Sequence, residues 1–272
     1  MGLQPHDDGR RPAVSREDGV LLIAQISDTH ILPPTSDQPA ARLRADCLRQ
    51  CVADINRHQP DAVIFTGDTV QHAQPDEYAW LRELLAPLQA PLYVVPGNRD
   101  DKNEMRAAFG DYAFVAGTGE FLQYVVEDYD TRLVGIDSTL EGERQGRFCD
   151  ARQAWLDKTL GEQPDRPTLL FIHHPPFDVG DHYVGGYRRP EEAVALEEIV
   201  GRNAQVVGLL CGHVHWPVSR EWAGTQARIM PSVAVDVRKG IDEEEVQGRP
   251  VYLLHQLSRA TGLASRAVTA EE

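Results

Sequence analysis

Two histidines end a buried strand in the stretch CGHVHWP, residues 211–217. The stretch directly follows the apolar run AQVVGLL, whose length and composition predict a buried β-strand. A strand end normally needs only turn residues, but here His213 and His215 stand one residue apart. Residues at i and i+2 of an extended chain point to the same side, so we expect both imidazoles to face one point.

Other apolar runs are followed by polar side chains of the same kind. Working outward from residue 211, these endings are IHHPPF with His173 and His174, PGNRD with Asn98, TGDT with Asp68, and SDTH with Asp28 and His30. In open α/β sheets, sites form just beyond the carboxyl ends of the strands, so these loops are predicted to converge. Gly67, Gly97 and Gly212 allow the backbone to turn tightly beside a ligand.

The first third of the chain alternates strand and helix patterns. Strands are predicted at 19–27, 61–67 and 91–97, and helices at 41–58, 75–88 and 102–110. The buried face of the first helix is predicted to hold Leu43, Cys47, Leu48, Cys51, Val52 and Ile55. This β-α-β-α-β order indicates parallel pairing with right-handed crossovers.

The rest of the chain mixes hairpins with crossovers. A hairpin is predicted at 120–138, helices at 150–161 and 190–202, and strands at 167–174, 204–212, 218–224, 227–234 and 250–257. Two mixed sheets packed face to face, with helices outside both, accommodate this order. Because no linker rich in Pro, Gly or Ser divides the chain, we expect one domain over 20–257, after a flexible N-terminal leader (1–19) and before a C-terminal tail (258–272).

Composition excludes several classes of protein. The chain has 272 residues, of which 42% are hydrophobic, and no run approaches the roughly 18 apolar residues of a membrane helix. The formal net charge of −15 disfavours nucleic-acid polymers and anionic membranes as partners. The N-terminus lacks the apolar stretch of a secretory signal. Reduced, mostly buried thiols are expected at Cys47, Cys51, Cys149 and Cys211, so a cytoplasmic location is predicted.

Imidazoles and carboxylates that converge describe a divalent-metal site. Two carboxylates, four histidines and one amide exceed what a single tetrahedral ion needs. They suit two ions about 3.5 to 4 Å apart that share a bridging carboxylate, the arrangement used for phosphoester displacement. Such a site is positive inside an acidic protein, so it can accept a phosphodiester anion. Any one of these motifs alone is more often an ordinary strand end or turn, and the interpretation depends on the ordered set.

The ordered set D-x-H, GD, GN-x-D, H-H-P-P and G-H-x-H resembles the calcineurin-like metallophosphoesterase superfamily. HHPPF and GHVH most resemble its class III cyclic nucleotide phosphodiesterases and the related glycerophosphodiesterases. The resemblance extends over residues 20–257 and implies an α/β fold, a four-layer α/β/β/α sandwich. It also implies one metal ion on Asp28, His30 and His215, a second on Asn98, His173 and His213, and Asp68 as the bridge.

One position departs from the family, which usually has histidine where this chain has Arg99 in GNRD. A guanidinium matches phosphoryl oxygens well, but its pKa above about 12 prevents it from protonating a leaving group readily. We expect Arg99 to stabilise transition-state charge; the alternative is an ion pair with Asp100 or Asp101. Asp100 or His174 is expected to hold a ligand's outer nitrogen or the attacking water, and the alternative for His174 is a hydrogen bond to a nearby carbonyl. Catalysis is assigned to Asp68, Asn98, Arg99 and His174.

The aromatic, glycine-rich segment at 177–190 is expected to form a pocket wall or lid, with His182, Tyr183 and Tyr187 as substrate-binding residues; the alternative is a contact with a second subunit. The function predicted is hydrolysis of a small phosphodiester, of the cyclic nucleotide or glycerophosphodiester type, by metal-activated hydroxide. The ligand set suits manganese, iron or zinc. The rivals are a phosphomonoesterase and a non-catalytic binding scaffold of the same fold, and a homo-oligomer is left open.

Overall fold

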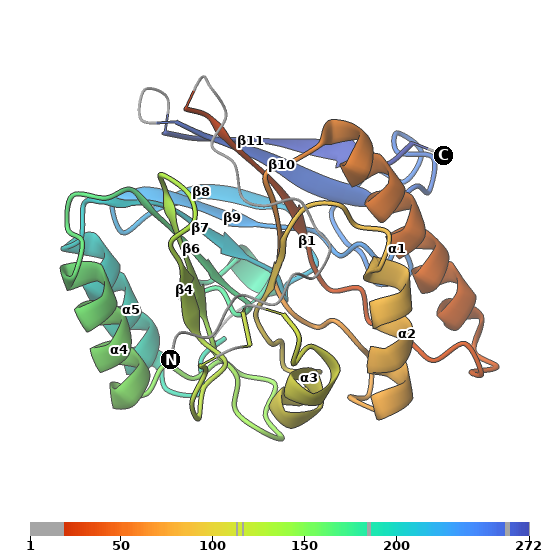
Figure 1. The fold of residues 1–272 in the computed structure, drawn as a ribbon, viewed down its shortest axis with the longest axis horizontal. Helices are drawn as coiled ribbons and strands as arrows, with labels where there is room; N and C mark the ends of the chain where they lie inside the picture. The colour runs from red at the N-terminus through yellow and green to blue at the C-terminus, as the bar shows by residue number, and fades with distance from the viewer. Residues whose placement is uncertain (1–18, 113, 116, 184–185, 259–261, 272) are drawn as a thin grey trace.

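The computed structural model describes residues 19–112, 114–115, 117–183, 186–258 and 262–271 (Figure 1). Apart from Gly19, the leader predicted at 1–19 lies outside the described residues. Two β-sheets face each other, with one helix pair outside each sheet (Figure 1). The α/β fold predicted as a four-layer α/β/β/α sandwich is therefore confirmed.

The first sheet has the order β11-β10-β1-β2-β3. Its strands are β1 (Leu21–Ile26), β2 (Ala62–Phe65), β3 (Leu92–Val94), β10 (Val251–Ser258) and β11 (Gly262–Thr269). The β1, β2 and β3 strands pair in parallel, as the alternation of strands and helices predicts. They are almost wholly apolar because both faces of this part of the sheet are covered.

The second sheet has the order β4-β5-β6-β7-β9-β8. Its strands are β4 (Tyr124–Val126), β5 (Arg132–Ile136), β6 (Thr168–Ile172), β7 (Val206–Cys211), β8 (Val218–Trp222) and β9 (Thr225–Ile229). The β4–β5 pair is the predicted hairpin, and β5, β6, β7 and β9 run parallel. In both sheets, the parallel strands therefore end at one edge.

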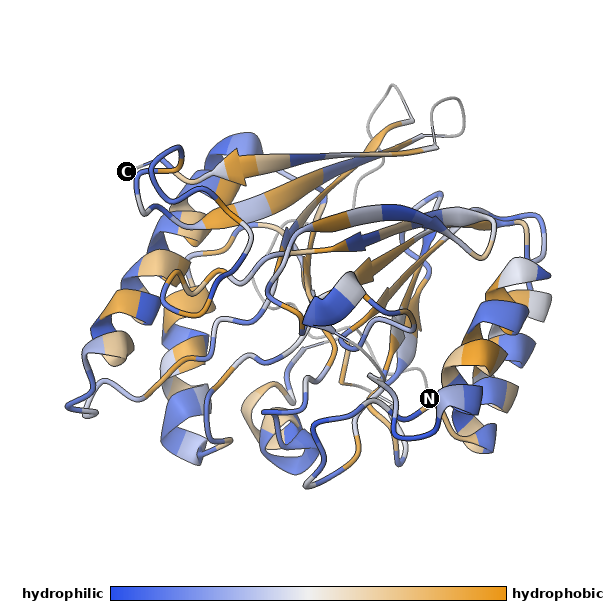
Figure 2. Cartoon of the chain, turned by 180° about the vertical axis from the view of Figure 1, so that it is seen from behind, coloured by the Kyte–Doolittle hydropathy of each residue, from blue (hydrophilic) through white to orange (hydrophobic). Residues whose placement is uncertain are grey.

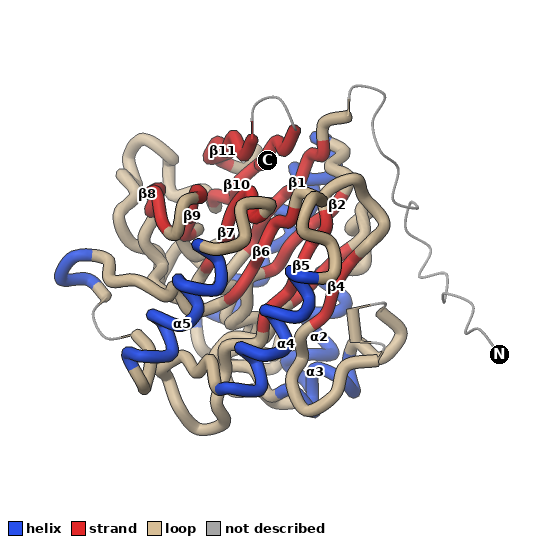
Figure 3. Tube along the Cα trace, turned by 90° about the vertical axis from the view of Figure 1, so that its left-hand side faces the viewer, coloured by secondary structure: helices blue, strands red, loops and turns tan. Residues whose placement is uncertain are grey.

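The helices are α1 (Pro39–His58), α2 (Pro75–Leu85), α3 (Lys102–Ala108), α4 (Asp150–Gly161) and α5 (Pro190–Gly201), with a short 3-10 turn at Gly180–His182. The α4 and α5 helices lie in front of the second sheet in Figure 3. In Figure 1 these two helices are at the left, and α1 and α2 lie at the right, on the opposite side of the two sheets. The predicted inner face of α1 is wrong at one position, because Leu43 is 41% exposed while Ala45 is buried beside Cys47 and Leu48.

Residues 262–269, which the sequence assigned to a C-terminal tail, form β11 and pair with β10 from Val251↔Thr269 to Ser258↔Gly262. The segment is half exposed, with Leu263 and Val268 buried and Ala264, Arg266 and Ala267 exposed, as is typical of an edge strand. Strands elsewhere in the molecule are mostly orange in Figure 2, whereas the helices alternate orange and blue along their length. None of the helices in the described part of the chain combines the length and apolar character needed to span a bilayer.

Candidate metal centre

The loops that leave β1 and β2 are joined by backbone hydrogen bonds. Asp28 donates its N–H to the carbonyl of Gly67 at 3.0 Å, and His30 donates to the carbonyl of Asp68 at 3.1 Å. Three predicted ligands from two strands are thereby fixed against each other. The backbone N–H of His213 donates to both carboxylate oxygens of Asp28, at 3.2 and 3.0 Å, which ties the second sheet to the first.

Five ligand residues have left-handed backbone, with φ of 53° at Asp28, 46° at His30, 49° at Asp68, 72° at His213 and 61° at His215. The i, i+2 spacing predicted extended backbone for the pair Asp28 and His30 and for the pair His213 and His215, and this prediction is wrong for both pairs. Each such non-glycine residue costs on the order of 1 kcal/mol, and strain of this kind gathers at functional sites. His213 and His215 do not face one point, since each joins a different group of side chains.

The first group contains Asp28, His30, Asp68 and His215. His215 Nε2 lies 3.2 Å from Asp28 Oδ1, and His30 Nε2 lies 3.1 Å from His215 Nε2. His30 Nε2 also lies 3.8 Å from Asp68 Oδ2. Two imidazole nitrogens and two carboxylates thus converge in one small volume.

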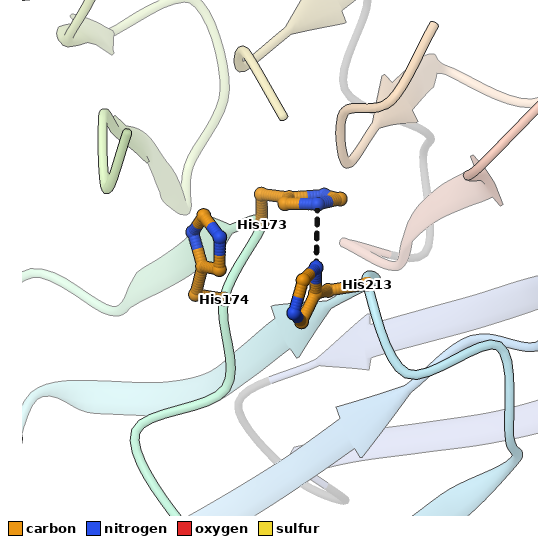
Figure 4. Close-up of side chains that lie close together, drawn as sticks. All are labelled: His173, His174 and His213. Carbon is orange, nitrogen blue, oxygen red and sulfur yellow. Dashed lines mark hydrogen bonds between the residues drawn. The ribbon is translucent and has the colours of Figure 1, made fainter. Parts of the chain in front are cut away.

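The second group forms around His173 and His213, whose Nε2 and Nδ1 atoms lie 3.1 Å apart (Figure 4). Asn98 Oδ1 lies 3.3 Å from His173 Nε2. Asp68 Oδ1 lies 3.5 Å from the same nitrogen, while its other oxygen faces His30. Asp68 therefore stands between the two groups with one oxygen toward each, which is the geometry of a bridging carboxylate.

The outer nitrogens of two ligand histidines fix their tautomers. His173 Nδ1–H donates to the carbonyl of Thr66 at 2.7 Å, and His215 Nδ1–H donates to the carbonyl of Val237 at 3.1 Å. Each ring then presents the lone pair of Nε2 to the centre, as a metal ligand must.

Charge and protonation also fit cations. Burial lowers the pKa of His30 to about 3 and lowers the pKa of His213 well below its usual value, so both rings are neutral at pH 7. Asp28 and Asp68 are almost fully buried, and no Lys or Arg among the described residues forms an ion pair with either carboxylate. Buried carboxylates need compensating positive charge. Two divalent ions would supply it, one in each group.

Two glycines are required by this packing. At Gly67, where φ is +89°, an added Cβ would lie 2.7 Å from His173 Nδ1. At Gly212, an added Cβ would lie 2.1 Å from the Ser27 hydroxyl, which itself donates to Asp28 at 2.5 Å. Larger residues at either position would displace a ligand.

His174 does not offer a free nitrogen to the centre. The Ser138 hydroxyl lies 2.8 Å from its Nδ1, and its Nε2 lies 3.1 Å from the carbonyl of Arg144. Its ring packs against that of His213 with centroids 4.5 Å apart, beside the His173–His213 pair in Figure 4. The alternative of a carbonyl-bonded histidine therefore describes His174 better than a role in holding the attacking water.

Arg99 follows Asn98, a predicted metal ligand, and lines a cavity there. Among the residues that the structure describes, neither predicted partner pairs with its guanidinium. Asp100 accepts hydrogen bonds from the backbone N–H groups of Thr69 and Gly97 and from the Thr69 hydroxyl, and Asp101 caps α3. Burial raises the pKa of Asp100 to about 6, and this carboxylate pins two ligand loops together.

The predicted substrate-binding residues at 177–190 pack against the site from outside. Tyr187 is buried and donates its hydroxyl to the carbonyl of His174 at 3.1 Å. Tyr183 contacts His213 ring to ring, with centroids 5.3 Å apart. His182 is exposed and stacks on Trp216 at 4.0 Å. None of the three lines the cavity beside Asn98.

That cavity has a volume of about 620 Å³ and is lined partly by residues that the sequence reasoning missed. Lys102 and Arg152 belong to its wall, and both reach Asp137, which follows the apolar run of β5. The ending IDS (136–138) carries the signal used at the other strands, polar side chains directly after a buried run, and it also supplies Ser138 to His174.

Comparison with known proteins supports the family resemblance that the sequence motifs indicate. The family model described as calcineurin-like phosphoesterase matches residues 21–217. A probable glycerophosphodiester phosphodiesterase of Arcobacter nitrofigilis is 34% identical over 254 residues, which cover 90% of this chain and 92% of that protein. A 3',5'-cyclic adenosine monophosphate phosphodiesterase of Pseudomonas aeruginosa is 28% identical over 82% of this chain and 80% of its own.

The fold also matches solved structures. A dimetal phosphatase of Danio rerio superposes with a TM-score of 0.68 over 92% of this chain and 99% of that one, at 13% sequence identity. At that identity the likeness concerns the fold alone. The extent of the family match and the identity to the Arcobacter protein go further: the chain belongs to the calcineurin-like phosphoesterase family.

Proposed function

We propose that the protein hydrolyses small phosphodiesters at a dinuclear divalent-metal centre formed by Asp28, His30, Asp68, Asn98, His173, His213 and His215. The observation that carries the proposal is Asp68, whose two oxygens face two separate groups of ligand atoms. When bound, a pair of divalent cations supplies Lewis acidity and a hydroxide nucleophile at neutral pH. The mixed nitrogen and oxygen ligands suit manganese, iron or zinc.

The protein's own groups hold this centre and orient the substrate. Thr66 and Val237 orient the rings of His173 and His215 through their carbonyls. Arg99 lines the cavity beside Asn98, where its guanidinium can bind the non-bridging phosphoryl oxygens and stabilise the charge that develops on them. Because a guanidinium does not release its proton, the leaving alcohol takes its proton from another source, in our proposal solvent.

His174 acts as a positioning residue in this scheme. It supports the ring of His213 and connects it to Ser138 and to the loop at Arg144. Both of its nitrogens are engaged, and burial lowers its pKa well below the usual value, so it is a poor proton donor at neutral pH.

The substrate class proposed is a glycerophosphodiester or a cyclic nucleotide, as in the names of the Arcobacter and Pseudomonas relatives. A phosphomonoesterase of the same fold, the rival already named from the sequence, is the second candidate. A non-catalytic scaffold is disfavoured, since all seven predicted ligand side chains are kept and converge. The cytoplasmic location and a homo-oligomeric state stay predictions.

Activity assays on two chromogenic esters test the proposal. We expect turnover of bis(p-nitrophenyl) phosphate well above that of p-nitrophenyl phosphate, loss of both activities on chelation, and recovery with Mn²⁺. The Asp68→Ala variant serves as the inactive control. Full activity after complete removal of metal would contradict the mechanism, and faster hydrolysis of the monoester would favour the phosphatase.

A further inference from the structure

The cavity beside Asn98 and Arg99 is unusually rich in cations for this protein. Five of its eighteen lining residues are basic, namely Arg99, Lys102, Arg106, Arg147 and Arg152, whereas 27 of the 272 residues in the chain are Lys or Arg. With a formal net charge of −15, most of the protein repels anions. This cavity is therefore a local exception that adjoins the metal centre.

Two of the five basic side chains bind other groups of the protein around the cavity. Arg147 pairs with Glu192 through both carboxylate oxygens at 3.0 Å. Arg106 donates to the backbone carbonyls of Gly119 and Glu120, at 2.7 and 3.3 Å. These contacts fix the shape of the cavity, and Arg106 keeps its charge without a carboxylate partner among the described residues.

Lys102 and Arg152 share a single carboxylate. Lys102 Nζ lies 3.2 Å from Asp137 Oδ2, and an Arg152 terminal nitrogen lies 3.6 Å from Asp137 Oδ1. Asp137 is fully buried and also accepts backbone N–H groups from Leu122 and Thr139. Two cations around one carboxylate leave one positive charge uncompensated at this wall.

Arg152 also keeps an unused donor. Its side chain is only 4% exposed, and its Nε is buried without a hydrogen-bond partner among the described residues. Its other nitrogens contact the Thr139 carbonyl at 2.6 Å and Cys149 Sγ at 3.6 Å, and its guanidinium lies 4.0 Å from the centre of the Phe121 ring. Because this Nε–H is closed off from solvent, Arg152 acts on the cavity through its positive charge and not through a free donor.

The acidic residues of the lining keep their charges, but among the described residues none of the four forms an ion pair with Lys102 or Arg152. Asp100 is engaged by backbone N–H groups and Asp101 caps α3. Glu120 and Glu141 are exposed to solvent, so their charges are screened at the rim. The interior of the cavity, at Lys102 and Arg152, keeps its positive character.

We propose that this cavity is the subsite for the alcohol substituent of the phosphodiester, and that Lys102 and Arg152 select a substituent carrying an anionic group of its own, a carboxylate or a phosphate. The inference rests on the proposed function, because it assumes a phosphodiester held by the metal centre. It adds the substrate class: diesters with a second negative charge away from the scissile phosphate.

Two matched substrate pairs test the subsite. Glycerophosphoserine differs from glycerophosphoethanolamine by one carboxylate, and glycerophosphoinositol 4-phosphate differs from glycerophosphoinositol by one phosphate. For the wild type, we expect kcat/KM to be higher for the more anionic member of at least one pair, by roughly 10- to 100-fold, as for a charge-assisted hydrogen bond. The pair that shows the preference identifies which anion the subsite takes.

Variants then assign the preference to the two side chains. We expect Arg152→Gln and Lys102→Gln each to bring the ratio within the preferred pair toward one. Lys158→Gln, an exposed position on the same helix as Arg152, makes the same charge change and is expected to keep the wild-type ratio. Since Arg152 is buried, Lys102→Gln at a side chain 22% exposed keeps the test decisive if the Arg152 variant fails to fold.

The outcomes separate the two levels of inference. If the wild type hydrolyses the diesters with ratios near one in both pairs, or if both variants keep the wild-type ratio, the subsite is contradicted while the proposed function stands. If the metal-loaded wild type hydrolyses neither these diesters nor bis(p-nitrophenyl) phosphate, the proposed function fails and the subsite falls with it.

Discussion

Two buried histidines, His30 and His255, have the same lowered pKa but opposite surroundings. Burial lowers the pKa of each to about 3. His255 lies in β10, where its Nε2 meets Gln25 Oε1 at 3.0 Å and its Nδ1 meets the Ser265 hydroxyl at 2.8 Å. His30 has left-handed backbone, its Nε2 faces another imidazole nitrogen, and its Nδ1 has no hydrogen-bond partner among the described residues.

Neither burial nor a lowered pKa therefore marks a functional histidine in this fold. A structural histidine has complementary partners on both nitrogens, so nothing is missing from its surroundings. Around His30, lone pairs and carboxylate oxygens face each other across a small volume, an arrangement that suits a bound cation. Changes at the metal centre should therefore affect metal content and turnover more than changes at satisfied polar groups such as His255.

The largest effect is expected for Asp68→Ala. This change removes a side chain whose two oxygens face the two ligand groups, so the binding of both metal ions should be lost or weakened. Turnover of bis(p-nitrophenyl) phosphate should fall by more than roughly 1,000-fold, beyond the roughly 10- to 100-fold typical of residues behind the ligands. The matched change His255→Gln should keep metal content and turnover. Elemental analysis and steady-state assays check both, and equal losses in the two variants would erase the distinction.

A smaller effect is expected for Arg99→Ala. Arg99 lines the cavity beside Asn98, and among the described residues its side chain forms no hydrogen bond or ion pair with a predicted ligand, so metal content should not change. Turnover should fall by roughly 100-fold, as for the loss of one donor to transition-state charge. An unchanged turnover would rule out this role for Arg99.

For His174→Gln, we expect turnover about 10-fold lower with both metal ions retained, because this ring supports His213 without presenting a nitrogen to the centre. His213→Gln, a change to the ring packed against it, should instead lose one of the two ions. The number of metal ions per chain distinguishes the two variants. Loss of an ion from the His174 variant would make His174 a ligand.

The smallest effect on activity is expected for His255→Gln, whose main effect should be on the pH dependence of stability. The pKa of His255 is lowered to about 3 in the folded protein from 6.5, so the unfolded chain binds more protons between these values. The stability contributed by neutral His255 is present above pH 6.5 and is lost as pH falls toward 3. At pH 5 the loss is about 2 kcal/mol. Denaturant unfolding should show the stability of wild type relative to His255→Gln falling by that amount from pH 7 to pH 5, and a constant difference would contradict it.

The strand ends were predictable from sequence because apolar runs and parallel crossovers fix which loops share an edge. The convergence of Asp28, Asp68 and His173 therefore needed no coordinates. The left-handed backbone at the ligands could not be predicted, because glycine marks such conformations only when the side chain is dispensable, and here the side chains are ligands.

The substrate side of the site was harder to predict. Lys102 and Arg152 meet Asp137 only because α3, α4 and the end of β5 come together in space, and no local pattern carries that information. An aromatic loop such as 177–190 suggests a pocket, yet Tyr187 is used to hold the carbonyl of His174. The edge strand β11 was missed because its apolar residues, at 263, 264, 267 and 268, do not recur at the period of two that marks a strand.

Two cations are expected to lie on either side of Asp68, one beside each of its carboxylate oxygens. Crystals grown with Mn²⁺ and measured at the manganese absorption edge test this expectation most directly. We predict two anomalous peaks about 3.5 to 4 Å apart, one beside His30 and His215 and the other beside His173 and His213. A single peak, no peak, or ligand side chains turned away from Asp68 in the metal-soaked crystal would contradict the account.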